Sequence, residues 1–176
     1  MNGRIKLDKV NITIKETTKD DLDNIMSLWN DGEVMYFVGF PDGLGITKEE
    51  MEKWFEWVTD KPKRCHYSIY EKDLGYCGET FYDVNEKGIA ALDIKLFPKA
   101  RGKGIAYTAL SYAIEQAFKD GNANAVYVEP HPDNHKAWKL YENLGFVSKP
   151  RPAYLEEGET YLEISRDEWK AKNRDL

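Results

Sequence analysis

The order of elements along the chain predicts one α/β domain, with a central mixed and largely antiparallel sheet of six to seven strands and about four helices. Segments with alternating apolar residues indicate strands, and apolar residues at i, i+3, i+4 and i+7 indicate helices that bury one face. The length of 176 residues suits one buried core, and no repeat, low-complexity tract or linker divides it. We therefore expect residues 1–176 to form a single domain, with an N-terminal extension at about 1–9 and a C-terminal tail at about 167–176.

The first half of the chain predicts a strand followed by two helices. The strand is expected at 10–15, where three aliphatic residues alternate. Each helix follows a capping box, in which a threonine precedes an acid by three residues, at 18–21 and at 47–50. The apolar, glycine-punctuated segment 35–45 between the helices is interpreted as a loop. The expected apolar stripes are Leu22, Ile25, Met26 and Trp29 in the first helix and Met51, Trp54, Phe55 and Val58 in the second.

The second half of the chain predicts an antiparallel meander and then helices that alternate with shorter strands. Short turns separate the strands of the meander, which favours hairpin connections. Gly145 follows the last expected helix, in the position where glycine commonly ends one. The expected elements, in order, are strands at 65–71, 74–84 and 89–97, a helix at 105–119, a strand at 125–129, a helix at 134–144 and a final hairpin of 146–148 with 160–165.

The composition excludes several classes of function. With 25 basic and 31 acidic residues the net charge is −6, which argues against a general nucleic-acid-binding surface. No stretch is apolar enough for a membrane span, and the N-terminus lacks the apolar core of a secretory signal. Cys65 and Cys77 have no metal-binding or redox spacing and are interpreted as reduced thiols in a cytoplasmic protein. No metal is expected, because Pro132 keeps His131 and His135 off a common helical face.

The most informative segment is the loop 98–106, which joins an expected strand to an expected helix. Gly102 and Gly104 allow the backbone to approach a ligand closely, and the helix directs free amides and the positive end of its dipole at that ligand. The pattern predicts an anion site, although it is neither a Walker loop nor a Rossmann fingerprint; the alternative is a turn with solvated lysines. The cations that cluster here are Lys95, Lys99, Arg101 and Lys103.

Two motifs in this part of the chain resemble signatures of the GCN5-related N-acetyltransferases (the GNAT family). Arg101-x-x-Gly104-x-Ala106 resembles Q/R-x-x-G-x-G/A, and residues 134–146 resemble N-x-x-A-x-x-x-Y-x-x-x-G-F. The similarity covers residues 10–165 and extends to the ribosomal-protein N-acetyltransferases and the aminoglycoside N-acetyltransferases. It implies that the fourth and fifth strands splay apart and that acetyl-CoA binds in the gap between them.

The resemblance also implies roles for the residues around that gap. The amides of residues 102–107 would hold the pyrophosphate, and the backbone of residues 94–96 would pair with the pantetheine arm and polarise the acetyl carbonyl. Asn134 would either bind near the pantetheine or cap the last helix, since asparagine is a favoured capping residue. The expected cofactor-binding residues are Ile94, Lys95, Leu96, Arg101, Gly102, Lys103, Gly104, Ile105, Ala106, Tyr107 and Asn134.

Direct acetyl transfer to an amine needs a base for the ammonium group and an acid for the departing thiolate. Tyr141 occupies the family's tyrosine position and is expected to be the acid, while its place on an apolar stripe also suits burial in the core. Three carboxylates remain open as the base: Glu129 at the end of a strand, Asp93 in mid-strand and Glu79 on the preceding strand. Water alone is a fourth option, and for each carboxylate the alternative is a surface or salt-bridged group.

The segment from Glu16 to Asp60 contains 12 acids and 3 lysines. In the family this region builds one wall of the acceptor site, so its charge favours a small cationic amine or a peptide or protein N-terminus. The alternative is two helices with solvated acidic faces. Dimers are common in the family, so a homodimer is an open option, and a non-catalytic acyl-CoA-binding module is the alternative function. The expected acceptor-binding residues are Met35, Tyr36, Phe37, Phe40, Glu79 and Tyr154.

Overall fold

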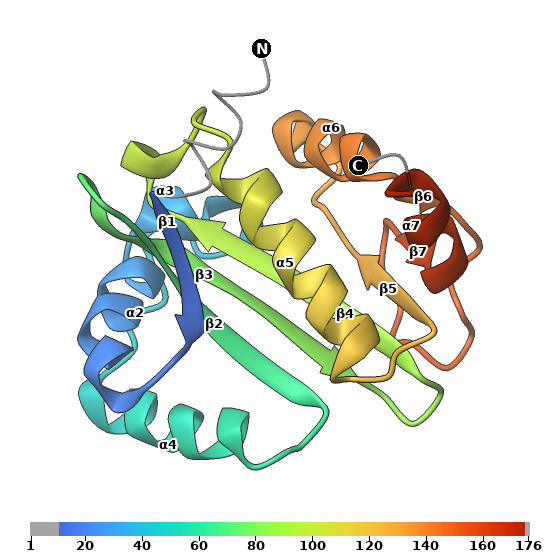
Figure 1. Ribbon diagram of the computed structural model, residues 1–176. Helices are drawn as coiled ribbons and strands as arrows, with labels where there is room; N and C mark the ends of the chain where they lie inside the picture. The colour runs from blue at the N-terminus through green and yellow to red at the C-terminus, as the bar shows by residue number, and fades with distance from the viewer. Residues whose placement is uncertain (1–10, 175–176) are drawn as a thin grey trace.

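The computed structural model describes residues 11–174 of the chain (Figure 1). One seven-stranded sheet runs through the domain in the order β1-β2-β3-β4-β5-β7-β6. Neighbouring strands are antiparallel except β4 and β5, which run parallel, so the predicted fold class is confirmed. The strands are β1 (Ile12–Glu16), β2 (Arg64–Glu71), β3 (Gly75–Val84), β4 (Ile89–Leu96), β5 (Ala125–Val128), β6 (Val147–Ser148) and β7 (Leu162–Ser165).

Six α-helices and three 3-10 helices accompany the sheet within the described residues. The α-helices are α2 (Leu22–Trp29), α3 (Gly32–Met35), α4 (Lys48–Thr59), α5 (Ile105–Lys119), α6 (His135–Leu144) and α7 (Arg166–Lys172). The 3-10 helices are η1 (Lys19–Asp21), η2 (Tyr36–Val38) and η3 (Pro98–Ala100).

Helices α3 and α7 are additional to the expected four. Each begins at a polar residue that accepts backbone amides: Asp31 accepts from two amides of α3, and Ser165 accepts from the amide of Glu168. These caps support short helices that apolar periodicity alone does not reveal. The expected tail from about residue 167 is therefore largely helical, and part of the expected loop 35–45 is the 3-10 turn η2. The expected extension at 1–9 lies outside the described residues.

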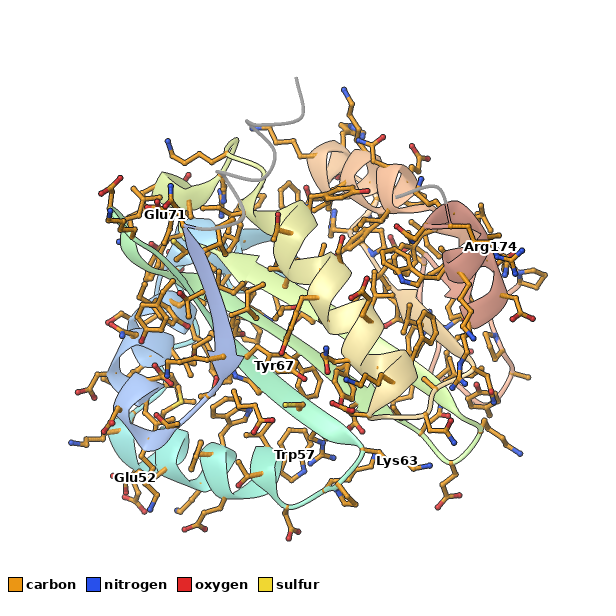
Figure 2. All side chains as sticks on the ribbon, viewed as in Figure 1. Glu52, Trp57, Lys63, Tyr67, Glu71 and Arg174 are labelled. Carbon is orange, nitrogen blue, oxygen red and sulfur yellow. The ribbon has the colours of Figure 1, made fainter. Side chains whose placement is uncertain are left out.

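One face of the sheet packs against α5, with α6 and α7 beside it (Figure 1). Leu110 and Ile114 of α5 are fully buried in this layer, where burying each side chain contributes about 1.5–3 kcal/mol. Figure 2 labels Tyr67 of β2 here, and its ring meets Tyr112 of α5 at a centroid distance of 5.2 Å. Gly145 ends α6 with a φ of 101°, as expected for a left-handed glycine cap.

The opposite face of β2 and β3 packs against α2 and α4 and carries buried polar groups. Because side chains alternate along a strand, His66 and Ser68 face these helices while Tyr67 faces α5. The ring of Trp54 on α4 lies 4.8 Å from both the Trp29 ring on α2 and the His66 ring, measured between centroids. Aromatic rings therefore enclose a set of hydrogen-bonding side chains on this side of the sheet.

Strand β4 pairs with β5 only over its first three residues. Their register runs from Ile89 with Ala125 to Ala91 with Tyr127. Beyond that point, β5 continues to pair with β7, whereas the rest of β4 pairs with β3 alone among the described strands. The predicted separation of the fourth and fifth strands is therefore present. Because β4 leads through η3 into α5, its free edge and the N-terminus of α5 lie together.

Candidate active site

A cavity of about 1030 Å³ lies where β4 and β5 separate. Its walls are the second half of β4, the loop and first turn of α5, the end of β5 with the start of α6, and the segment of α3 and η2. The predicted residues Asp93, Glu129, Asn134 and Tyr141 all line it. Residues predicted from two separate motifs therefore meet in one cavity.

The N-terminus of α5 opens into this cavity without a side-chain cap. Helices α4, α6 and α7 each have a side-chain oxygen that accepts a backbone amide at the N-terminus, whereas α5 begins at Gly104 and has none. Gly102 and Gly104 have φ angles of 71° and 77°, and a Cβ atom on either would meet open space. The amides of the first turn are therefore available to an anion such as a phosphate group.

Ten of the eleven residues expected to bind the cofactor line the cavity. The exception is Lys103, which is exposed on the loop. Asn134 also caps α6, because its Oδ1 accepts a hydrogen bond from the Ala137 amide at 3.2 Å. Capping is therefore one role of Asn134 in this structure, and its position in the cavity wall leaves contact with a ligand as a second.

The middle of the free β4 edge carries a carboxylate that is bonded to its own strand. Oδ1 of Asp93 accepts a hydrogen bond from the Ile94 amide at 2.8 Å, and Oδ2 contacts Nζ of Lys95. The Asp93 side chain lines the cavity and is 54% exposed, although both of its oxygens have partners. An incoming ligand would meet both the amide of Ile94 and the carboxylate that already binds it.

Tyr141 reaches the cavity from α6 while its ring belongs to the core. The ring packs against Phe146 at a centroid distance of 5.6 Å, and the residue is 7% exposed. Burial raises the pKa of the Tyr141 hydroxyl, and the negative charge of Asp93 raises it further. The phenol therefore stays protonated at neutral pH and is available as a hydrogen-bond donor, which suits the predicted acid.

Glu129 lies in the same cavity and is paired with a cation. Its Oε1 contacts Arg151, and the Glu129 side chain remains 42% exposed. Arg151 is fixed in place because it donates to the carbonyls of Glu156 at 2.7 Å and Thr160 at 3.1 Å. Both of the cavity-lining base candidates, Glu129 and Asp93, are thus held by a basic side chain.

Glu79 does not line the cavity, which corrects its expected roles as a base and as an acceptor-binding residue. It is 4% exposed on the α2 and α4 side of β3. Its carboxylate lies 2.8 Å from Nε2 of His66, accepts from Nε1 of Trp29 at 2.7 Å, and lies 3.6 Å from Nζ of Lys95. Burial alone would raise the pKa of Glu79, but His66 and Lys95 lower it. Glu79 therefore serves as a buried anion behind the cavity wall.

The wall opposite β4 comes from α3 and η2. Phe37 lines the cavity as expected, with its ring 5.4 Å from that of His131 between centroids. Glu33 lies 3.6 Å from Arg101, between the Oε1 and guanidinium nitrogen atoms. These two contacts connect η2 to the segment before α6 and α3 to the loop before α5. Neither Glu33 nor His131 was predicted as a site residue, although Asp31 is a recognisable helix cap just before Glu33.

The other residues expected to bind the acceptor lie elsewhere. Met35, the last residue of α3, is 3% exposed and packs with the buried side chains of α2. Tyr36, Phe40 and Tyr154 are 60%, 42% and 47% exposed and are not part of the cavity wall. Of the six expected acceptor-binding residues, only Phe37 lines the cavity.

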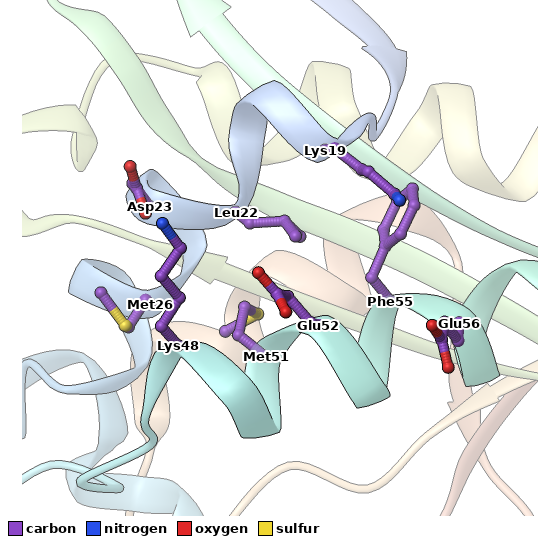
Figure 3. A pocket seen from close by; sticks show the side chains of 9 residues that line it. All are labelled: Lys19, Leu22, Asp23, Met26, Lys48, Met51, Glu52, Phe55 and Glu56. Atoms are coloured by element: carbon purple, nitrogen blue, oxygen red, sulfur yellow. The ribbon is translucent and has the colours of Figure 1, made fainter.

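A second hollow of about 340 Å³ lies between α2 and α4 (Figure 3). Its acids and lysines project around the rim, and the side chains of Leu22 and Met51 lie between the two helices. None of the predicted catalytic or cofactor-binding residues lines it. The residues that Figure 3 labels are Lys19, Leu22, Asp23, Met26, Lys48, Met51, Glu52, Phe55 and Glu56.

The cysteines and histidines provide no separate reactive centre within residues 11–174. Burial raises the pKa of the thiols of both Cys65 and Cys77, which makes them poor nucleophiles. In the same range, no group of three or more His, Cys, Asp or Glu side chains is arranged to hold a metal ion. No helix there combines the length and apolar character needed to cross a membrane.

The family model of the acetyltransferase (GNAT) domain matches residues 11–147. The chain belongs to the GNAT family. The predicted family is thereby confirmed, and the matched region is an acetyltransferase domain of that family. The cavity at the β4–β5 separation lies entirely within the residues that this family model matches.

Two curated relatives are similar in sequence. An uncharacterized N-acetyltransferase of Methanocaldococcus jannaschii is 27% identical over 144 residues, which cover 78% of this chain and 61% of that protein. The spermidine N(1)-acetyltransferase of Vibrio cholerae is 25% identical over 140 residues, covering 78% of this chain and 80% of that protein. The chain thus spans about three fifths of the first relative and four fifths of the second.

Solved structures confirm the fold. The spermidine N-acetyltransferase of Vibrio cholerae in complex with CoA and spermine aligns with a TM-score of 0.77 at 20% identity, covering 91% of this chain and 98% of that one. A GNAT-family acetyltransferase of Streptococcus pneumoniae aligns with a TM-score of 0.71 at 22% identity, covering 88% and 99% respectively.

Proposed function

We propose that this domain transfers the acetyl group of acetyl-CoA directly to a primary amine of a small polycation such as a polyamine. One observation carries the proposal: the uncapped N-terminus of α5, the free edge of β4, Tyr141 and Glu129 all open into a single cavity. The first two features suit a phosphate-bearing cofactor with an extended arm, and the last two suit proton transfer.

The residues present fit acetyl-CoA. The first-turn amides of α5 and the open space at Gly102 and Gly104 suit the pyrophosphate, and Arg101 adds a positive charge beside them. The free edge of β4 offers backbone groups to the pantetheine arm in the manner of an added strand. When bound there, acetyl-CoA supplies an acetyl thioester as the activated acyl donor.

The acid and the base follow from the cavity wall. Glu129 is our choice for the base. Arg151 contacts only its Oε1, so Oε2 can accept a proton. In Asp93, by contrast, the Ile94 amide engages one oxygen and Lys95 engages the other. Glu129 would accept the proton of the acceptor ammonium, directly or through water. Tyr141, kept protonated by burial, would donate a hydrogen bond to the departing sulfur.

The choice of a small polycation rests on charge and shape. Glu33, Asp93, Glu129 and Asp133 all line the cavity, and Phe37 offers an aromatic face for methylene groups. Several carboxylates at intervals suit an amine with more than one positive charge. The curated relative from Vibrio cholerae is a spermidine N(1)-acetyltransferase, which agrees with this choice.

Thiol release from acetyl-CoA against a panel of amines tests the proposal. The panel holds spermidine and spermine, aminoglycosides, amino acids and basic peptides with free N-termini. We expect the fastest release with the polyamines, and a mass increase of one acetyl group on the consumed amine. A preference for peptides would instead favour a protein N-terminus as the acceptor. Binding of acetyl-CoA without release to any amine would favour a non-catalytic cofactor-binding module.

We also propose that the reaction takes place in the cytoplasm. Acetyl-CoA as a soluble co-substrate and two unpaired cysteines suit the cytoplasm. A homodimer remains an option that sedimentation of the purified protein would decide. Neither point alters the chemistry assigned to the cavity.

A further inference from the structure

Lys95 lines the cavity, and its side chain ends in a primary amine. It lies on β4 between Ile94 and Leu96, in the stretch of backbone that the proposed function assigns to the cofactor arm. The side chain is 12% exposed. An amine at this position competes with the external acceptor for the acetyl group, unless it is kept from reacting.

Two carboxylates hold the ammonium group of Lys95. Nζ contacts Oδ2 of Asp93 on the cavity side and lies 3.6 Å from Oε1 of Glu79 on the other side. The two acids come from adjacent strands, because Glu79 and Lys95 are direct register partners of β3 and β4. Lys95 therefore sits between one exposed and one buried acid.

The buried acid cannot turn away, since its own surroundings are fixed. Nε1 of Trp29 donates to Glu79 at 2.7 Å, and Nε2 of His66 lies 2.8 Å from the other carboxylate oxygen. Nδ1 of His66 lies 2.7 Å from Oγ1 of Thr17. A chain of contacts from Thr17, which follows β1, through β2 and β3 thus supports the anion that faces Lys95.

We propose that Lys95 is a latent self-acetylation site, and that Asp93 and Glu79 keep it as an unreactive ammonium so that the acetyl group is left for the external amine. This inference rests on the proposed function, because it needs acetyl-CoA in the cavity. It assigns Asp93 and Glu79 a protective role that neither proton transfer nor acceptor binding requires.

The physical reason is a balance of burial and charge. Burial alone would lower the pKa of Lys95, whereas Asp93 and Glu79 raise it above its ordinary value. The groups that face Lys95 are Asp93 on its own strand and Glu79 on β3, with His66 on β2 behind Glu79. If both acids are replaced by amides, burial still lowers the pKa of Lys95 but no negative charge raises it. A larger fraction of Lys95 is then neutral. Each unit by which the pKa falls raises the neutral fraction about tenfold at neutral pH.

The step that the two acids suppress is an ordinary acyl transfer. The lone pair of neutral Nζ attacks the acetyl carbonyl carbon, the carbon–nitrogen bond forms and the carbon–sulfur bond breaks. The nitrogen loses one proton and the sulfur leaves as the CoA thiol, which takes up one proton. The product is an uncharged acetyl-lysine, and no oxidant or reductant is involved.

The first experiment compares the wild-type protein with the double variant Glu79→Gln, Asp93→Asn. Each is incubated with acetyl-CoA and no acceptor, and acetylation of the peptide that contains Lys95 is followed by mass spectrometry. We expect the variant to acetylate Lys95 at least about tenfold faster than the wild type. Equal rates, or ready acetylation of wild-type Lys95, would overturn the inference.

Lys149 offers a matched control. It is also paired with two carboxylates, Glu163 at 3.3 Å and Glu168 at 3.1 Å, which raise its pKa, but it does not line the cavity. The double variant Glu163→Gln, Glu168→Gln should leave acetylation of Lys149 by acetyl-CoA close to the background rate. A rise at Lys149 as large as that at Lys95 would show that the reaction does not depend on the cavity, and would overturn the inference.

A second readout needs no cofactor. Trace labelling with acetic anhydride across a pH series reports the pKa of individual amines in the protein without CoA. We expect labelling of Lys95 to begin at lower pH in the Glu79→Gln, Asp93→Asn variant than in the wild type, and an unchanged profile would contradict the protective role. The single variant Asp93→Asn serves if the double variant fails to fold, because the Asp93 side chain is 54% exposed.

The two readouts separate this inference from the proposed function. Wild-type protein that neither binds acetyl-CoA nor acetylates any amine would defeat the proposed function, while the anhydride profile would still decide whether the two acids hold Lys95 as an ammonium. Wild-type protein that acetylates polyamines, together with a variant whose Lys95 stays unmodified by acetyl-CoA, would overturn the inference and leave the function intact.

Discussion

The two halves of the cavity use opposite strategies. The unpaired half is the loop 102–104 with the first turn of α5, where the backbone amides have no side-chain cap. The paired half consists of charged side chains that already have partners, namely Glu129 with Arg151, Asp93 with Lys95 and Glu33 with Arg101. A phosphate group can therefore bind to the unpaired half without displacing a side-chain cap, whereas an incoming ammonium must compete with a resident cation in the paired half.

This difference places selectivity in the paired half. The pair of Glu33 with Arg101 is exposed on both sides, and such surface ion pairs are worth about 0–1 kcal/mol, so an ammonium of the right shape can replace Arg101 there at little cost. An amine that reaches only one carboxylate gains less than one that reaches several. We therefore expect changes in the unpaired half to weaken cofactor binding in general, and changes in the paired half to alter rate and acceptor choice.

The largest expected effect comes from the base. The change Glu129→Gln should lower kcat about 100-fold, because general-base catalysis contributes about 10²–10⁴-fold and an amide cannot accept the proton. The change Asp93→Asn should lower kcat less than about tenfold, since both oxygens of Asp93 are engaged by other groups. Steady-state kinetics with a polyamine, together with acetyl-CoA affinity measured by calorimetry, would check this ranking. The reverse ranking would make Asp93 the base.

The next largest effect is expected in the unpaired half. The change Gly104→Asp should weaken acetyl-CoA binding about 30-fold, because it places a carboxylate beside the site proposed for the pyrophosphate, and like charges repel. Gly75→Asp is the matched control: Gly75 has a φ of 72°, its Cβ would also meet open space, and it is the first residue of β3 and does not line the cavity. Calorimetric titration with CoA should separate the two variants. Equal affinities would show that α5 does not hold the cofactor.

Tyr141 lines the cavity, and removal of its hydroxyl group tests its proposed role as the acid. The change Tyr141→Phe should lower kcat at least about tenfold with little change in acetyl-CoA affinity, because it removes one hydroxyl group and keeps the packing against Phe146. Single-turnover kinetics should show the loss in the chemical step. An unchanged rate of that step would remove Tyr141 from the mechanism and leave it a core residue.

The unpaired half was predictable from the sequence, and the paired half was not. Glycines and a helix start leave a local signal, so the loop 98–106 and helix 105–119 could be located from residue types alone. Ion pairs depend on the register of strands and on loops that return from far along the chain. The contact of Glu129 with Arg151 requires the long loop before β7, and no local pattern specifies it.

Glu79 shows the same limit within one sheet. Alternation along β3 tells which residues share a face with Glu79, but not which helices cover that face. The packing of Trp29 and Trp54 over His66 and Glu79 turns that face into a buried polar layer. The carboxylate expected at the acceptor site is therefore enclosed, and Lys95, expected only as a backbone contact, becomes the side chain that connects this layer to the cavity.

Asn134 has two proposed roles, capping α6 and contacting the cofactor. The smallest expected effect decides between them. Its Oδ1 caps α6 through the Ala137 amide, so Asn134→Ala should destabilise the protein by about 1 kcal/mol. Serine is an equally favoured cap but lacks the amide group, so Asn134→Ser should restore stability in thermal unfolding. If capping is the only role, the serine variant should also bind acetyl-CoA as the wild type does. Normal stability with weakened binding would show instead that the Asn134 amide contacts the cofactor, and the motif would then join the two halves of the cavity through one side chain.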